Sequence, residues 1–302
     1  MTLQPNDVYN IDNILKYGIY HNASDINITT DEELAFRING DIKKINHKPN
    51  MQLINNYIDV LTKSMSKKID VYQKTAIDGS YVMKFKNEDY YFRYNISLTI
   101  QKVHMTIRKL INKIPKFEDI QLTNNKELEF IKKINDNKTG LYLLVGATGS
   151  GKTTTIVTIL DYVLKNNKIK AISLEEPIEF YFKNKDYENS IIIQREVHKD
   201  TKSFYDGLVE AMRQNPDLIF VGEIRDKNTA IAALNAALTG HVVIATLHAK
   251  SIEKTTDRFK YLLDGITNDL DFIQGIIYQQ LNKDENGKIK AIRDVYINKE
   301  NF

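Results

Sequence analysis

The stretch GATGSGKTT, at positions 146–154, combines glycines, hydroxyls and one lysine in a spacing that binds phosphate. An apolar run (141–145) precedes it and apolar residues at helical spacing follow it, so it should join a buried strand to a helix. There, the N–H groups at the helix start converge on an oxyanion, Lys152 reaches the β- and γ-phosphates, and the Thr153 hydroxyl binds Mg²⁺. A glycine-rich turn without a ligand is the alternative, and the flanking strand and helix disfavour it. The predicted nucleotide-binding residues are Gly146, Thr148, Gly149, Ser150, Gly151, Lys152, Thr153 and Thr154.

Carboxylates follow two of the predicted buried strands. Glu175, Glu176 and Glu179 come after the strand at 169–174, and Glu223 ends the apolar run 217–223. Parallel α/β sheets bind ligands at the carboxyl ends of their strands, so these groups should face the same phosphate site. Clustered carboxylates repel one another unless a cation lies among them. A solvated acidic turn is the alternative for 175–179, and the phosphate-binding stretch upstream favours the functional interpretation.

Histidines stand at both ends of a further predicted strand, 242–247. His241 precedes this strand and His248 follows it. A single histidine is more often structural than catalytic. We nevertheless expect both side chains to flank the edge of the sheet that faces the nucleotide.

Composition limits the classes of protein to consider. The 302 residues carry a formal net charge of +3, from 42 basic and 39 acidic side chains. This charge alone does not indicate nucleic-acid binding, which is usually accompanied by a clear basic excess or stripe. No cysteine is present, which excludes disulfides and thiolate zinc sites, so no zinc is expected. The apolar runs are far shorter than the roughly 18 residues of a membrane helix, and no signal-peptide pattern opens the sequence. We therefore expect a cytoplasmic protein.

The two halves of the chain differ in pattern, which predicts two domains. Residues 1–112 mix amphipathic helices (8–20 and 51–65) with short alternating segments, as in a small α+β domain with a curved antiparallel sheet. Asn39 and Gly40 predict a hairpin turn, and residues 77–79 predict another turn. Residues 113–120 are predicted to be a polar linker. From 121 to 302, helices alternate with buried strands, as in a parallel α/β domain.

Blocks of residues in a fixed order resemble the secretion ATPases of type II secretion, type IV pili and DNA-uptake pili. They are the Walker A block GATGSGKTT (146–154), an Asp box ISLEEPIEF (172–180), a Walker B block MRQNPDLIFVGEIRD (212–226) and a His box TGHVVIATLHAKS (239–251). QREVH (194–198) and, more loosely, SDINI (24–28), FRING (36–40), FRYN (92–95) and TIR (106–108) also resemble the family. The resemblance implies a RecA-like P-loop NTPase domain preceded by a smaller, PAS-like α+β domain. This short, cysteine-free chain is most similar to the competence-pilus ATPases of Gram-positive bacteria.

The resemblance also implies roles for individual residues. Glu223 would polarise the attacking water, and arginine fingers from the first domain would stabilise charge on the transferred phosphoryl group. For the two arginines, exposed basic strand residues are the alternative. Glu176 stands where the family usually has aspartate, so its longer arm leaves the metal geometry open. The implied catalytic residues are Glu223, Glu179, Glu175, Arg93, Arg108 and His248, and the implied Mg²⁺ ligands are Thr153 and Glu176.

The resemblance further implies ATP and Mg²⁺ as ligands, a homo-hexameric ring and a polytopic inner-membrane platform protein as partner. Pilin-like proteins would be served indirectly, no direct nucleic acid is expected, and the ring would lie peripherally on the inner face of the membrane. Assembly of a pilus or pseudopilus is the expected output. AIR (291–293) echoes a helical motif of retraction ATPases, but its segment alternates like a strand and the sequence ends soon after. Pilus retraction, nucleic-acid translocation and a low-turnover nucleotide-binding scaffold are the alternatives.

Overall fold

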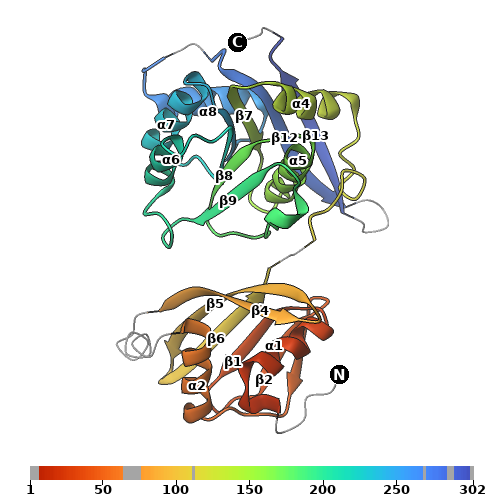
Figure 1. Ribbon diagram of the computed structural model, residues 1–302, viewed down its shortest axis with the longest axis vertical. Helices are drawn as coiled ribbons and strands as arrows, with labels where there is room; N and C mark the ends of the chain where they lie inside the picture. The colour runs from red at the N-terminus through yellow and green to blue at the C-terminus, as the bar shows by residue number, and fades with distance from the viewer. Residues whose placement is uncertain (1–6, 64–75, 111–112, 268–269, 284–288, 300–302) are drawn as a thin grey trace. The chain divides into compact units, whose positions relative to one another are not determined.

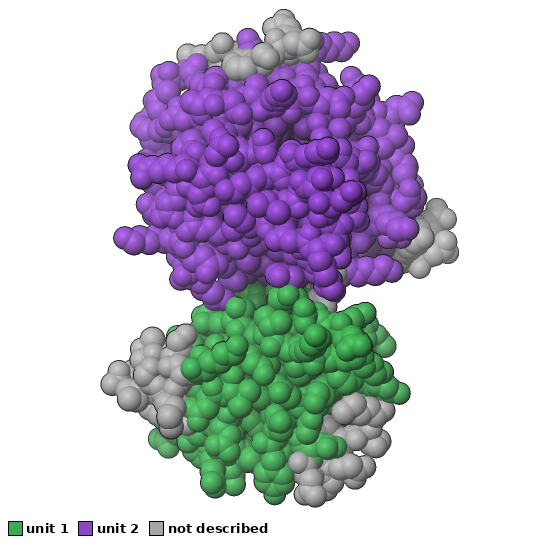
Figure 2. All heavy atoms as spheres, in the orientation of Figure 1, with its two compact units in different colours: residues 1–112 green, residues 113–302 purple. Residues whose placement is uncertain are grey.

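The computed structural model describes residues 7–63, 76–110, 113–267, 270–283 and 289–299. The chain divides into two compact units, Met1–Asn112 and Lys113–Phe302 (Figures 1 and 2). Among the described residues, unit 1 has one hydrophobic core cluster and unit 2 has two. Within the described ranges, no helix is both long enough and apolar enough to cross a bilayer.

Unit 1 is built on a six-stranded antiparallel sheet with the order β3-β2-β1-β6-β5-β4. Buried residues of α1 and α2 form one core with residues of this sheet, so the unit is the expected small α+β fold (Figure 1). Its elements are η1 (Asp7–Tyr9), α1 (Ile11–Tyr20), β1 (Ala23–Thr29), β2 (Leu34–Ile38), β3 (Asp41–Ile45), α2 (Met51–Thr62), β4 (Ile77–Phe85), β5 (Glu88–Thr99) and β6 (Lys102–Lys109).

Local features of unit 1 confirm one predicted turn and correct another. Asn39 and Gly40 have positive φ values of 52° and 92° and join β2 to β3, as the hairpin signal predicts. The turn predicted at 77–79 is wrong, because these residues begin β4. A Cβ on Gly79 would lie 2.1 Å from the ring of Tyr94, so this glycine admits a cross-strand aromatic ring rather than turning the chain. The predicted helix 51–65 ends at Thr62, and residues 64 and 65 lie outside the described part.

Unit 2 is a seven-stranded sheet with the order β13-β12-β7-β11-β10-β8-β9. All neighbouring strands are parallel except β12 and β13, which confirms the predicted α/β class. Residues 291–293 lie within β13, so the strand predicted there is also confirmed. The elements are α4 (Asn125–Asp136), β7 (Gly140–Val145), α5 (Lys152–Asn166), β8 (Lys170–Glu175), η2 (Asn184–Asp186), β9 (Ile191–Glu196), α6 (Phe204–Met212), β10 (Leu218–Val221), α7 (Lys227–Leu238), β11 (Val242–Leu247), α8 (Ile252–Leu263), β12 (Ile273–Lys283) and β13 (Ile289–Ile297).

Alternating side chains of β7 enter two different cores, one on each face of the sheet. Leu141, Leu143 and Val145 pack with residues of α6, α7 and α8, whereas Tyr142 and Leu144 pack with residues of α4 and α5 (Figure 1). A strand covered on both faces must be apolar along its whole length, which is why 141–145 contains no charged residue. The polar residues of unit 2 that could bind a ligand therefore lie at the two ends of the strands, where the loops are.

The segment predicted as a polar linker packs onto unit 2. Ile114, Phe117 and Ile120 are partly buried against the core that α4 and α5 share with the sheet. The ring of Phe117 lies 5.1 Å, centroid to centroid, from that of Tyr162 on α5. Charged and polar neighbours conceal these apolar residues in the sequence.

Candidate nucleotide-binding site

The glycine-rich stretch forms the turn from β7 into α5. Gly146, Gly149 and Gly151 have positive φ values of 153°, 77° and 81°, which side-chain-bearing residues rarely adopt. Gly151 is the N-cap of α5, and no side chain caps that helix start. The N–H groups of the first turn of α5 are therefore available to an anion, and the positive end of the helix dipole points the same way.

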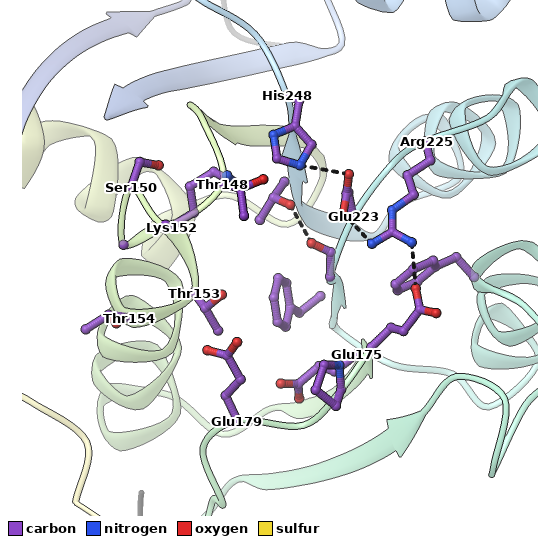
Figure 3. Close-up of a pocket in the computed structure, with 18 of the residues that line it drawn as sticks. Thr148, Ser150, Lys152, Thr153, Thr154, Glu175, Glu179, Glu223, Arg225 and His248 are labelled. Carbon is purple, nitrogen blue, oxygen red and sulfur yellow. Dashed lines mark hydrogen bonds and ion pairs between the residues drawn. The ribbon is translucent and has the colours of Figure 1, made fainter. Parts of the chain in front are cut away.

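A pocket of about 660 Å³ opens at this turn (Figure 3). It brings together most of the residues that the sequence predicts for the site. Gly146, Arg93, Arg108 and His241 are not among its lining residues. The pocket is lined by Thr148, Gly149, Ser150, Gly151, Lys152, Thr153, Thr154, Glu175, Glu176, Pro177, Glu179, Phe204, Phe220, Gly222, Glu223, Arg225, Thr246, His248 and Leu281.

Lys152 is folded back onto the turn. Its Nζ donates to the carbonyl oxygens of Gly146 and Ala147, each at 2.9 Å. Partial burial lowers the pKa of this ammonium, and the nearby Glu223 carboxylate opposes that shift. The cation is thus held by neutral carbonyl groups, which a phosphate can displace because it brings a full opposing charge.

Glu223 is held by cationic or protonatable groups on both carboxylate oxygens. It follows the four-residue strand β10, with Gly222 between them. Arg225 Nη2 lies 2.7 Å from Glu223 Oε2, and His248 Nε2 lies 3.1 Å from Glu223 Oε1 (Figure 3). The other ring nitrogen of His248, Nδ1, lies 3.1 Å from the Gly146 carbonyl oxygen. His248 therefore connects the carboxylate after β10 to the glycine-rich turn between β7 and α5.

Arg225 and His198 were not predicted from the sequence as parts of this site. Arg225 Nη1 donates to Glu176 Oε2 at 2.8 Å, and His198 Nε2 lies 2.9 Å from Glu176 Oε1. The hydrogen bond to Glu223 raises the pKa of Arg225. Both residues belong to blocks quoted above, Arg225 to the Walker B block and His198 to QREVH, so a signal for them was present. Both oxygens of Glu176 are bound to these partners, so a metal role for Glu176 requires exchange of them and stays a prediction.

Glu175 is a buried acid with one unsatisfied oxygen. Its Oε1 accepts from Ser173 Oγ at 2.6 Å and from Gln194 Nε2 at 3.0 Å, whereas its buried Oε2 has no hydrogen-bond partner. Burial raises the pKa of this carboxyl to about 7, although the two hydrogen bonds act in the opposite direction. Glu179 lies on the same side of the pocket as Thr153 in Figure 3. A cation among these oxygens would satisfy Glu175 and favour its charged form.

The two predicted arginine fingers lie in unit 1. Arg93 on β5 and Arg108 on β6 are direct cross-strand neighbours. Arg108 Nε donates to Asp25 Oδ1 at 2.7 Å, and Arg37 lies 3.7 Å from the same carboxylate. Adjacent guanidinium groups repel each other, and the nearly buried Asp25 carboxylate offsets that repulsion. A role for either arginine in the reaction stays a prediction.

The prediction that both histidines face the nucleotide is wrong for His241. It precedes β11 and lines a different pocket, at the amino ends of the parallel strands. Its Nδ1 lies 3.1 Å from the Ala236 carbonyl oxygen, near the end of α7. The six-residue strand β11 lies between His241 and His248 and places them at opposite ends of the sheet. Only His248 therefore reaches the glycine-rich turn.

A smaller pocket of about 180 Å³ adjoins the back of the same turn. Gly151 and Thr154 line both pockets, and Gln279 of β12 and Arg293 of β13 contribute to the smaller one. The segment Asp119, Ile120 and Gln121 forms another wall. Neither Gln279 nor Arg293 was predicted as a site residue, because each is an ordinary polar residue in a strand far along the sequence.

Comparisons with known proteins agree with this geometry. The family model described as "Type II/IV secretion system protein" matches residues 7–294. The type IV pilus retraction ATPase PilT of Pseudomonas aeruginosa is 33% identical over 250 residues, which span 82% of this chain and 69% of that protein. The competence protein ComGA of Bacillus subtilis is 32% identical over 178 residues, 57% of this chain and 47% of ComGA.

Solved structures resemble the chain over nearly its whole length. The crystal structure of the pilus retraction motor PilT with bound ADP has a TM-score of 0.81 and 33% identity, covering 95% of this chain and 82% of that one. The Legionella pneumophila ATPase DotB has a TM-score of 0.77 and 27% identity, covering 99% of this chain and 84% of DotB. The similarity to these two structures therefore extends over both units and not over the P-loop alone.

Proposed function

This chain is a member of the type II/IV secretion system protein family, and from that premise we propose that it is a Mg²⁺-dependent ATPase motor. One observation carries the proposal. A single pocket holds the uncapped start of α5, Lys152, and a carboxylate, Glu223, whose position is fixed by His248 and Arg225. A phosphate cradle facing a restrained carboxylate is the arrangement that phosphoryl transfer to water requires.

The roles proposed for these residues follow from their chemistry. Lys152 and the N–H groups of 148–154 bind the phosphates, and Thr153 contributes its hydroxyl to Mg²⁺, which neutralises charge on the phosphate oxygens. Glu223 orients the attacking water and accepts its proton. Glu175 and Glu179 support the water or the metal. The unsatisfied, buried Oε2 of Glu175 fits a site that receives a cation.

The smaller pocket is proposed to receive the nucleoside. Because it shares Gly151 and Thr154 with the larger pocket, a nucleotide whose phosphates lie on the turn can place its base on the other side of the same turn. Asp119, Ile120 and Gln121, which precede α4, also line this pocket. The bound ADP named for the PilT structure is consistent with nucleotide binding in this fold.

The cellular role that we propose is assembly of a type IV-like pilus or a type II secretion pseudopilus, in competence or in secretion. The motor would be a homo-hexameric ring on the inner face of the membrane, acting on a polytopic platform protein and through it on pilin-like subunits. The similarity to the competence protein ComGA supports the setting in competence. The placement of 291–293 in β13 supports assembly, since the resembling motif of retraction ATPases is helical.

Pilus retraction is a second candidate, favoured by the similarity to PilT over 82% of this chain. A deletion strain distinguishes the two. Loss of an assembly motor leaves few or no surface filaments and abolishes DNA uptake or secretion. Loss of a retraction motor leaves more or longer filaments than the parent strain, and that result would replace our assignment.

The proposed chemistry is tested by phosphate release and by binding of a fluorescent ATP analogue. We expect Mg²⁺-dependent turnover in the wild type, and loss of nucleotide binding in Lys152→Ala. Lys165→Ala, which removes the same charge from the last turn of the same helix, should behave like wild type. Wild-type protein that binds ATP without hydrolysing it would indicate a scaffold. Salt-sensitive stimulation by single-stranded DNA would indicate a translocase.

A further inference from the structure

Gln279 of β12 forms polar contacts with both the phosphate-binding turn and the helix that follows it. Its Nε2 donates to the Ser150 carbonyl oxygen at 2.6 Å, and its Oε1 accepts from Thr155 Oγ1 at 2.7 Å. The backbones of Gly146 and Gln279 also approach each other closely. A Cβ added to Gly146 would lie only 2.2 Å from the Gln279 carbonyl oxygen. Gln279, Thr155 and Ser150 are all buried. The turn therefore cannot shift without moving Gln279 or breaking these bonds.

Arg293 of β13 extends this contact to a segment far away in the sequence. Its Nε donates to the same Gln279 Oε1 at 2.7 Å. Its Nη2 donates to the Ile120 carbonyl oxygen at 2.9 Å, and its Nη1 donates to the Gln121 carbonyl oxygen at 3.2 Å. The side chain is only 2% exposed. Each nitrogen of the guanidinium group thus has a fixed acceptor, and two of these acceptors lie in the stretch that leads out of unit 1.

The last contact of Arg293 reaches the start of α4. Nη1 lies 3.4 Å from Glu127 Oε1, and the other oxygen of Glu127 accepts from the Asn124 backbone N–H at 2.9 Å in a capping box. Glu127 is also buried. Arg293 therefore contacts both the later part of segment 113–124 and the first turn of α4. Burial lowers the pKa of this guanidinium and Glu127 opposes that shift, but arginine remains charged.

We propose that Gln279 and Arg293 are positioning residues that couple nucleotide on the phosphate-binding turn to the order of segment 113–124. The inference rests on the proposed nucleotide site. A nucleotide restricts the turn, the turn restricts Gln279, and Gln279 and Arg293 restrict the carbonyl groups of Ile120 and Gln121. Unit 1 is covalently joined to unit 2 through this segment. Nucleotide binding therefore changes the order of the chain segment that connects the two units. Coupling is reciprocal, so ordering of the segment also strengthens nucleotide binding by the same factor.

The test is amide hydrogen exchange of segment 113–124 in the full chain, with and without saturating Mg–ADP, together with the ADP dissociation constant. In the wild type, ADP should slow exchange roughly tenfold, within the usual range of such couplings. Arg293→Lys keeps the charge but cannot reach several acceptors at once. We expect it to reduce the ADP-dependent change to less than about twofold and to weaken ADP binding by the factor lost. Arg258→Lys on α8, where the arginine is exposed, is the matched control.

A second pair of variants keeps the proposal testable if Arg293→Lys does not fold. Thr155→Val removes the hydroxyl that donates to Gln279 and preserves the shape of the side chain, whereas Thr155→Ser retains the hydroxyl. Only the valine variant should lose the ADP-dependent protection.

A merely structural role would speed exchange equally with and without ADP. If the ratio of the exchange rates without and with ADP is unchanged in Arg293→Lys or Thr155→Val, the coupling is overturned. Wild-type protein that binds ADP without any change in the segment also overturns it, whereas absence of ADP binding overturns the proposed function itself.

Discussion

Two pockets of similar volume lie at opposite ends of the parallel strands of unit 2. The pocket at the carboxyl ends measures about 660 Å³ and the pocket at the amino ends about 580 Å³. Helix α5 begins at the first pocket, whereas α4, α5 and α7 all end at the second. Unpaired N–H groups attract anions and unpaired carbonyl groups repel them, so only the first pocket suits a phosphate. Chain direction, and not cavity size, therefore decides which end suits a phosphate.

The charged groups follow the same division. The carboxyl-end pocket is lined by Lys152, Glu175, Glu223 and His248. Lys152 and His248 both contact the Gly146 carbonyl oxygen, and His248 also contacts Glu223. The amino-end pocket has many asparagines together with Lys138, Lys168, Asp136 and Asp217, which terminate helices and loops. Hydrogen bonds such as that from the Lys170 N–H to Asp217 Oδ2, at 2.8 Å, satisfy the backbone there. These residues stabilise strand starts and need no ligand to do so.

Substitutions in unit 1 test whether the carboxyl-end pocket is sufficient by itself. If Arg93 and Arg108 act as arginine fingers, replacing either with alanine should lower kcat by roughly 10³-fold or more, with a much smaller change in ATP affinity. Arg37→Ala is the matched control, because Arg37 also approaches Asp25. The measurement is steady-state phosphate release by the purified full chain. Unchanged kcat in both variants would leave these arginines as surface residues and make the pocket of unit 2 complete.

Removal of one charge at each end gives the most direct contrast. Glu223→Gln should lower kcat at least about 100-fold, because the amide cannot accept a proton from water, while ATP binding is retained on the intact turn. Asp217→Asn at the amino ends should change kcat by no more than about twofold. Turnover and binding of a fluorescent ATP analogue measure the two quantities separately. Wild-type turnover in Glu223→Gln would remove this residue from the mechanism.

The buried acid at the carboxyl ends predicts a pH dependence of stability. The pKa of Glu175 rises from 4.5 to about 7 on folding, so the folded protein holds this proton more tightly than the unfolded chain. The stability that this proton provides is therefore present below pH 4.5 and is lost as pH rises through 7. At 1.36 kcal/mol per pKa unit, the loss is about 3 kcal/mol, in the absence of Mg–ATP.

Glu175→Gln isolates this effect, because glutamine resembles the protonated acid and does not titrate. Urea unfolding at pH 5 and pH 8 should show similar stability of the two proteins at pH 5 and a more stable glutamine variant at pH 8. Identical pH dependence in both proteins would mean that Glu175 is charged in the folded state throughout this range.

The division between the two ends also explains what could be predicted from the sequence. The turn 146–154 and the carboxylates at or just after the ends of β8 and β10 were predictable, because residue type and order along the chain locate the carboxyl end of a strand. Arg225 and His198 were missed although they stand close to predicted residues, since an ion pair between loops depends on how the loops fold. Gln279 and Arg293 were beyond such reasoning, because they reach the turn only through the pairing of β12 with β7 and of β13 with β12.

The sequence predicts that His241 and His248 both face the nucleotide, whereas the structure places them at opposite ends of β11. His248 contacts Glu223 and the Gly146 carbonyl group, so His248→Ala should lower kcat roughly tenfold, the scale of one hydrogen bond to a charged group. The imidazole of His241 lies 3.1 Å from the Ala236 carbonyl oxygen and 3.5 Å from Thr239 Oγ1, both near the end of α7, so His241→Ala should leave kcat within about twofold of wild type. The two variants form a matched pair, with the same residue removed at opposite ends of β11. Because His241→Ala removes a contact at the end of α7, its Tm is measured as well, and a small loss of Tm with unchanged kcat fits a structural histidine. If His241→Ala loses turnover while His248→Ala keeps it, the amino ends of the strands take part in the reaction, and the assignment of the site to the carboxyl ends is wrong.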